Sequence, residues 1–205
     1  MIGIFTQFLQ LFSAARDPAA PSWFDRVKAF FGGSIARGGA SSAPQKSGIV
    51  EAVTNILTAG QQKDIDVLAR TLWGEARGEG VRGMHAVANV IMRRHSLRKY
   101  GQGWPSFGPV AGSVAQIAQA PWQFSAWNPD DPNREKLLTV SESDPDFKKA
   151  KQIAAAAVRG ELPDITAGAD HYHTAAVKPN WSKGQTPVAV IGNHKFFRLV
   201  NFAGV

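Results

Sequence analysis

Cysteine is absent from the 205 residues, and this excludes disulfides, thiolate metal sites and a cysteine nucleophile. The sequence also contains no G-x-S-x-G nucleophile elbow, no H-E-x-x-H zinc motif and no lysine at the position of a phosphate-binding loop. A serine hydrolase of the elbow type, a metalloprotease with that motif and a P-loop enzyme are therefore not predicted.

Acidic residues are few compared with basic ones. The 16 aspartates and glutamates face 23 lysines and arginines, which gives a net charge of +7. A basic chain favours polyanions such as nucleic acid, anionic lipid or acidic wall polymers. The densest basic run, residues 93–99, is predicted to be a solvated helix end, with anion binding as the alternative. No zinc-finger or RNA-binding signature is present, so nucleic acid is not a predicted partner.

Long apolar runs are also missing. The first stretch, MIGIFTQFLQLFSAA, is interrupted by Gln7 and Gln10 and is too short for an ordinary transmembrane helix. Residues 1–32 are predicted to form an N-terminal amphipathic helical extension. We expect it to contact a membrane surface or another protein, to pack on the main domain, or to act as an uncleaved export signal. Residues 33–47 are rich in Gly, Ala and Ser and are predicted to be a linker.

The remaining residues, 48–205, are predicted to form one domain. Apolar residues recur at helical spacing from Ile65 to Ala76, from Met84 to Ile91, from Val114 to Ala118 and from Phe147 to Val158. After Gly160 the pattern changes to short segments typical of strands, HYHT, PVAVIG and HKFFRLVNF. Helices followed by a small sheet indicate the α+β class.

Two glutamates stand four residues apart in TLWGEARGEG, residues 71–80. Glu75 falls in the last turn of the first predicted helix, where the negative end of the helix dipole and the apolar neighbours Leu72 and Trp73 both disfavour a charged carboxylate. These effects favour the neutral carboxyl that a general acid requires. Glu79 lies between two glycines, where nothing in the sequence clearly favours a proton.

The histidines support a competing hypothesis. His171 and His173 are alternate residues of a predicted strand, so both side chains point to one face, and His194 follows further on. Together with Glu75 or Glu79 they could bind zinc in an amidase or peptidase. The alternative is a set of histidines in a cleft that only make hydrogen bonds.

Aromatic residues are frequent in segments rich in Gly, Pro, Asn and Ser, and many of them are expected in the core. Those on loops beside amide side chains suit a polar polymer with apolar ring faces, and sugars fit this description. The aromatic residues of these segments are Trp104, Trp122, Phe124, Trp127, Tyr172 and Trp181, and the neighbouring amides are Gln123, Asn128, Asn180 and Asn193.

Six segments in order resemble the SleB-like cell wall hydrolases, a family named for a spore cortex-lytic enzyme and also found in bacteria and phages. The segments are LARTLWGEARGE (68–79), GMHAVANVIMRR (83–94), SVAQIAQAPWQFSAWN (113–128), IAAAAVRGELPDITAGADHYHT (153–174), PNW (179–181) and IGNHKFFR (191–198). They cover about two thirds of the chain, and the first 60 residues lie outside the resemblance.

The resemblance implies a mainly helical, lysozyme-like domain with a small antiparallel sheet that cleaves the glycan strands of peptidoglycan. It implies a lytic transglycosylase without cofactor or metal, with Glu75 as the essential glutamate and Glu79 as a supporting residue. The residues that we expect to bind substrate are Gln123, Phe124, Ser125, His171, Tyr172, His173, Trp181, Asn193 and His194.

Three alternatives remain at the sequence level. They are a muramidase with two carboxylates, the zinc-dependent amidase or peptidase described above, and a wall-binding module without activity. The resemblance places the chain at the cell wall, in the periplasm or outside the cell. A phage lysin released by a holin, a lysin carried in a virion and a bacterial wall-remodelling enzyme all fit the sequence. The compact size and the short basic extension favour a phage or prophage lysin of a Gram-negative system.

Overall fold

The computed structural model describes residues 45–201, and their side chains from residue 58 onward. Nearly all of these residues belong to one compact unit, Gly48–Val205. The helical extension predicted at residues 1–32 lies outside the described residues, as does most of the predicted linker. Residues 45–47, the end of that linker, form the first turn of helix α3, Gln45–Ala76.

Helix α3 ends where the sequence becomes rich in glycine. Its residues Leu68, Ala69, Leu72 and Ala76 are buried, which matches the apolar face predicted from their spacing. A single 3-10 turn, η1, continues from Arg77 to Glu79. Gly80 then adopts a φ of 67°, a conformation that favours glycine, and the chain turns into the next helix.

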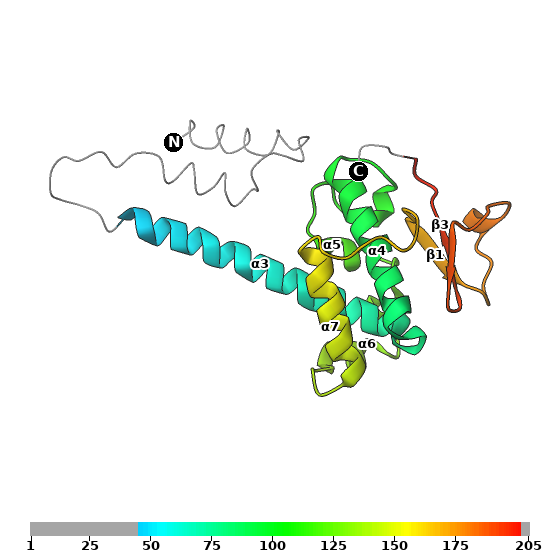
Figure 1. Cartoon of the computed structure of the whole chain (residues 1–205), viewed down its shortest axis with the longest axis horizontal. Helices are drawn as coiled ribbons and strands as arrows, with labels where there is room; N and C mark the ends of the chain where they lie inside the picture. The colour runs from blue at the N-terminus through cyan, green and yellow to red at the C-terminus, as the bar shows by residue number, and fades with distance from the viewer. Residues whose placement is uncertain (1–44, 202–205) are drawn as a thin grey trace. The chain divides into compact units, whose positions relative to one another are not determined.

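Helix α4, Gly80–Lys99, lies at the centre of the described unit. Figure 1 shows it between helix α7 and the sheet, and both elements contact it. Buried residues surround nearly its whole circumference, which is typical of a core helix. The prediction of a solvated end for residues 93–99 is wrong in part, because Arg94 and Arg98 are only 6% and 7% exposed.

Two further helices have caps that the sequence encodes. Helix α5, Val114–Ala118, begins with a capping box between Ser113 and Gln116. Helix α7, Pro145–Val158, begins at Asp144, whose carboxylate accepts hydrogen bonds from the amides of Asp146 and Phe147. A short helix that the sequence analysis did not predict, α6, spans Arg134–Thr139. The other 3-10 turns are η2 Pro105–Phe107, η3 Ser125–Trp127 and η4 Asn180–Ser182.

The three predicted strand segments form one antiparallel sheet in the order β1-β3-β2. Its strands are β1 His171–Thr174, β2 Ala189–Ile191 and β3 His194–Phe197. Ile191 and Phe196 pack with Ala86 and Val90 of α4. The sheet is thus anchored on the central helix, and residues of β1 lie close to the end of α3.

The class predicted from the sequence, α+β with mainly helical structure and a small antiparallel sheet in the C-terminal part, is confirmed. Four helices were expected from apolar spacing, and α3, α4, α5 and α7 correspond to them. In the part of the chain that the structure describes, no helix combines the length and the apolar character needed to cross a membrane.

Candidate active site

Glu75 lies in the last turn of α3, with its side chain partly buried. Its Oε2 accepts a hydrogen bond of 2.9 Å from the hydroxyl of Tyr172. The backbone amides of Ser125 and Ala126 also donate to this carboxylate. Three segments that are far apart in the sequence therefore meet at one carboxyl group: the end of α3, the turn η3 and the strand β1.

Burial is the largest influence on Glu75 and raises its pKa above the ordinary value of 4.5. Hydrogen bonds from Tyr172, Ala126 and Ser125 lower this pKa, and the negative charge of Asp131 raises it further. The net direction is upward, as the sequence predicted from the helix end and the apolar neighbours. A raised pKa increases the fraction of protonated carboxyl near neutral pH, so Glu75 is suited to donate a proton.

Tyr172 is the partner that holds this carboxyl group. Burial and the nearby charge of Glu75 raise the pKa of the Tyr172 phenol well above 10, so the hydroxyl remains a neutral donor. The ring stacks on Phe196 at 5.8 Å between centroids and meets His194 edge to face at 5.2 Å. The strand β1 thus fixes the ring, and the fixed ring positions the hydroxyl on Glu75.

Arg94 of α4 is a buried cation close to this pair. Its Nε donates to the carbonyl of Asp170 at 2.7 Å and its guanidinium donates to Gln123 Oε1 at 3.3 Å. The guanidinium also lies over the rings of Phe107 and Phe124, 4.6 and 5.5 Å from their centroids. Burial lowers the pKa of Arg94 to about 10, and the nearby Asp170 carboxylate opposes this shift, so Arg94 stays charged at neutral pH.

Residues 123–126 form one wall of the site, and three of the predicted binding residues belong to it. Gln123 is partly exposed and bonded to Arg94, while Ser125 is exposed and its amide faces Glu75. Phe124 is only 1% exposed and packs in the core. Its side chain therefore supports the wall from beneath, whereas Gln123 and Ser125 have surface that a ligand can contact.

Glu79 has a different environment from Glu75. Its two carboxylate oxygens accept hydrogen bonds from the backbone amide and the side-chain amide of Asn193, at 2.9 and 3.0 Å. These two bonds lower the pKa of Glu79, and the charge of His194 acts in the same direction. A Cβ atom on Gly192 would collide with this carboxylate. Glu79 therefore links the β2–β3 turn to the start of α4 as a charged group.

The predicted histidines lie together but are engaged elsewhere. His171 Nδ1 is 2.6 Å from Asp170 Oδ1, and His173 Nδ1 is 2.8 Å from the carbonyl of Thr174. Both rings pack against Trp181, with centroids at 4.9 and 5.5 Å. The common face predicted for the H-x-H step is thus observed, and it is covered by aromatic rings.

His194 lies on the opposite face of the sheet, next to Tyr172. Its side chain is 4% exposed and its Nδ1 has no hydrogen-bond partner among the described residues. Burial lowers the pKa of His194, with Glu79 opposing this and His173 adding to it. Among residues 58–201, no group of three His, Asp or Glu side chains is arranged to hold a metal ion.

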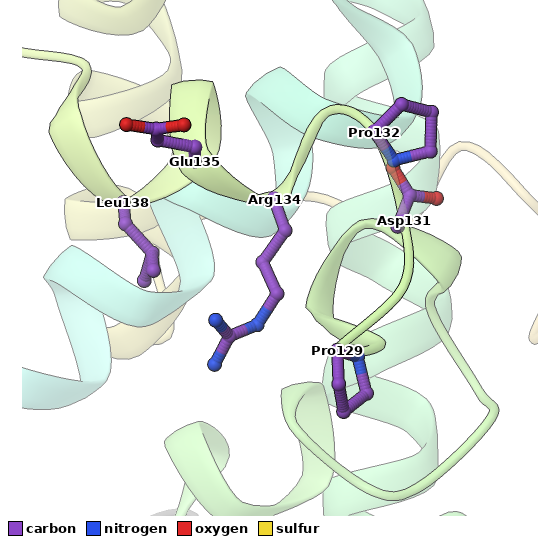
Figure 2. Close-up of a pocket in the computed structure, with 6 residues that line it drawn as sticks. All are labelled: Pro129, Asp131, Pro132, Arg134, Glu135 and Leu138. Carbon is purple, nitrogen blue, oxygen red and sulfur yellow. The ribbon is translucent and has the colours of Figure 1, made fainter.

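A pocket of about 450 Å³ opens beside the segment that follows η3. Figure 2 shows its six lining side chains, with Arg134 extending into the space that they surround. Asp131 lines this pocket and is also the charge that raises the pKa of Glu75. One residue that lines the pocket is therefore close enough to Glu75 to influence the pKa of its carboxyl group.

Sequence reasoning missed two residues of this site, Arg94 and Asp131. Arg94 was predicted to belong to a solvated basic run. It lies three residues before Leu97, however, and this spacing places both side chains on the same buried face of α4. That spacing was the available signal. Asp131 sits in the turn-rich stretch NPDDPN, and its effect on Glu75 depends on a contact between distant segments that local patterns do not encode.

The family model of cell wall hydrolases matches residues 78–197, and Glu75 lies just before this segment. Two solved structures are similar to the chain, each with a TM-score of 0.48 and with 66% of this chain covered. The catalytic domain of the SleB protein of Bacillus cereus is 26% identical over 89% of its own length. The catalytic domain of the germination-specific lytic transglycosylase SleB of Bacillus anthracis is 28% identical over 93%.

Among curated proteins, none matches the chain significantly. The family model alone covers more than half of the 205 residues. The chain belongs to the cell wall hydrolase family.

Proposed function

We propose that this protein cleaves the glycan strands of peptidoglycan as a lytic transglycosylase, with Glu75 as general acid and base. One observation carries the proposal. A partly buried carboxyl with a raised pKa is held by a tyrosine hydroxyl and two backbone amides, in a chain that belongs to the cell wall hydrolases. Such a carboxyl can donate a proton and then persist as a stabilised carboxylate.

The proposed reaction uses this carboxyl group twice. Protonated Glu75 donates its proton to the glycosidic oxygen between N-acetylmuramic acid and N-acetylglucosamine, and the C–O bond breaks with its electron pair leaving on that oxygen. The 6-hydroxyl of the same muramic acid attacks the oxocarbenium-like carbon and forms a 1,6-anhydro ring. Its proton returns to Glu75, so one carboxyl group serves both steps.

Tyr172 and the amides of Ser125 and Ala126 stabilise the Glu75 carboxylate that forms when the proton leaves. Gln123 and Ser125 have exposed surface near this group and are proposed to contact the sugar. Trp181, which packs with His171 and His173 on the other face of the sheet, is proposed to contact the strand further from the cleaved bond. His171, His173, His194 and Phe124 are buried and are proposed to support the site. Asn193 holds Glu79 in place, and Glu79 supports the site as a structural anion.

Simple hydrolysis is a second candidate, and the charge of Asp131 favours it. Asp131 is a second carboxylate whose charge acts on Glu75, and most glycosidases that hydrolyse with water use two carboxylates. In this mechanism Asp131 would activate a water molecule, while Glu75 would remain the acid. The two candidates differ in their products.

The test is analysis of the fragments released from purified peptidoglycan. Anhydro-muropeptides support the transglycosylase, whereas fragments with reducing-end sugars support hydrolysis. New amino groups from cut peptides would instead indicate an amidase or peptidase. Glu75→Gln is expected to abolish release of glycan fragments, and substantial remaining activity would disprove the role of Glu75.

A stability measurement shows whether that variant is folded. Because folding raises the pKa of Glu75, the folded protein binds more protons than the unfolded chain, and the native carboxyl destabilises the fold as pH rises above its unfolded pKa. We therefore expect Glu75→Gln to melt at a higher temperature than the native protein at pH 7. The difference should vanish below about pH 4, where Glu75 is protonated in both states.

A further inference from the structure

Trp122 stands out among the large apolar side chains of the described residues, because 75% of its surface is exposed, more than for any of the others. In this part of the chain its indole makes no hydrogen bond, no ring contact and no cation–π contact. An exposed indole therefore contributes little to the stability of the fold, and its position calls for a different explanation.

The backbone at Trp122 is unusual as well. The amide of Gln123 donates to the carbonyl of Ala120 at 3.2 Å, which makes residues 120–123 a β-turn with Pro121 at its second position. Trp122 occupies the third position with a φ of 63°. Turns with proline second and a positive φ third normally carry glycine or asparagine there. A bulky residue in this conformation is a true outlier, and such outliers cluster at ligand-binding sites.

The turn leads directly into the wall of the candidate active site. Gln123 bonds to Arg94, and the amides of Ser125 and Ala126 face Glu75. Trp122 precedes Ser125 by three positions, so their Cα atoms lie at most about 11 Å apart. These contacts anchor the residues that follow the turn at the site, and the exposed indole is thereby close enough along the chain to reach a sugar next to the cleaved bond.

We propose that Trp122 is a stacking platform for a sugar ring of the glycan strand next to the scissile bond. A pyranose has an apolar face of C–H groups, and an exposed, preorganised indole offers a flat apolar surface of matching kind at little cost in side-chain entropy. The inference rests on the proposed function, since it takes the glycan strand as the ligand near Glu75.

The role of Trp122 can be tested by measuring binding to purified peptidoglycan by co-sedimentation. All variants carry Glu75→Gln, so that the polymer is not consumed. Trp122→Gly removes the ring and also fits the turn better than tryptophan. We expect it to weaken binding by about tenfold or more with an unchanged or higher Tm. Trp122→Phe keeps a smaller flat face, so its affinity for peptidoglycan should lie between those of the parent and Trp122→Gly. In the active protein, Trp122→Gly should raise KM more than it lowers kcat.

Ala111→Gly is the matched control, because Ala111 is an exposed residue with a φ of 55° and lies in another loop. Relief of backbone strain there should leave binding unchanged. If Trp122→Gly binds peptidoglycan as tightly as the parent while the active protein still releases glycan fragments, the platform is disproved and the proposed function stands. If no glycan fragments are ever released but Trp122→Gly still weakens binding, the proposed function fails and the platform stands.

Discussion

At the scale of single residues, two glutamates that stand four positions apart in the sequence have different environments in the fold. Glu75 is partly buried with a raised pKa, and Glu79 is bonded to Asn193 with a lowered pKa. The upward direction of the Glu75 pKa was predictable, because the apolar neighbours that help to bury it are local in the sequence. The role of Glu79 was not, because its partner lies 114 residues away. The two glutamates thus differ in their pKa shifts, which agrees with the proposed roles of Glu75 as proton donor and Glu79 as a charged structural group.

Removing the hydroxyl that holds Glu75 should change the pH dependence of cleavage. The Tyr172 hydroxyl lowers the pKa of Glu75, so Tyr172→Phe should raise that pKa. In the proposed mechanism cleavage requires protonated Glu75, and we therefore expect the rate to fall as pH rises through this pKa. In Tyr172→Phe we expect this fall at higher pH, together with a kcat lower by about tenfold or more, since a hydrogen bond to the carboxylate product is lost.

The control for this experiment is the only other tyrosine of the chain, Tyr100, which is 49% exposed at the end of α4. Tyr100→Phe should leave both kcat and the pH profile unchanged. A Tyr172→Phe profile that shifts to lower pH would contradict the hydrogen bond as the cause.

At the scale of elements, three segments of the chain form the site. The end of α3 supplies Glu75, the wall before and within η3 supplies the amides, and β1 supplies Tyr172. Apolar spacing predicted α3, and the HYHT segment predicted β1. The wall has no regular pattern, since its shape depends on Arg94 and Phe124 packing from beneath. Sequence periodicity therefore located two of the three parts, and tertiary packing determined the third.

The link between Glu79 and Asn193 joins the sheet to the helices, and it can be tested by substitution. Because hydrogen bonds lower the pKa of Glu79 in the folded state, its stabilising effect is present above its unfolded pKa and is lost as pH falls through the folded pKa. Glu79→Gln should thus lower the Tm at pH 7, with the loss disappearing in acid. We expect its rate of glycan cleavage to fall by less than about tenfold.

Asn193→Ala provides the matched comparison, since it removes one of the two bonds while Glu79 remains. Both substitutions weaken the same contact. The sum of the Tm losses of Glu79→Gln and Asn193→Ala should therefore exceed the Tm loss of the double variant. Complete loss of cleavage in Glu79→Gln, with an unchanged melting profile, would make Glu79 the second catalytic carboxylate and overturn its structural role.

At the scale of the whole molecule, every residue assigned to the site lies between positions 75 and 194, inside the compact unit Gly48–Val205. The family match, residues 78–197, lies in the same unit. The sequence predicted a boundary at residue 47 from the Gly, Ala and Ser composition before it. That prediction depends on composition alone, because a segment with few apolar residues cannot bury a core of its own.

A chain shortened to residues 48–205 should therefore keep the activity. We expect it to release glycan fragments from purified peptidoglycan at a rate within about fivefold of the full chain, a difference of about 1 kcal/mol in the barrier. The comparison uses equal molar amounts, with Glu75→Gln in both lengths as the inactive control. If the shortened chain is folded by circular dichroism but inactive on purified wall, residues 1–47 contribute to catalysis. A loss confined to intact cells would instead assign those residues to targeting.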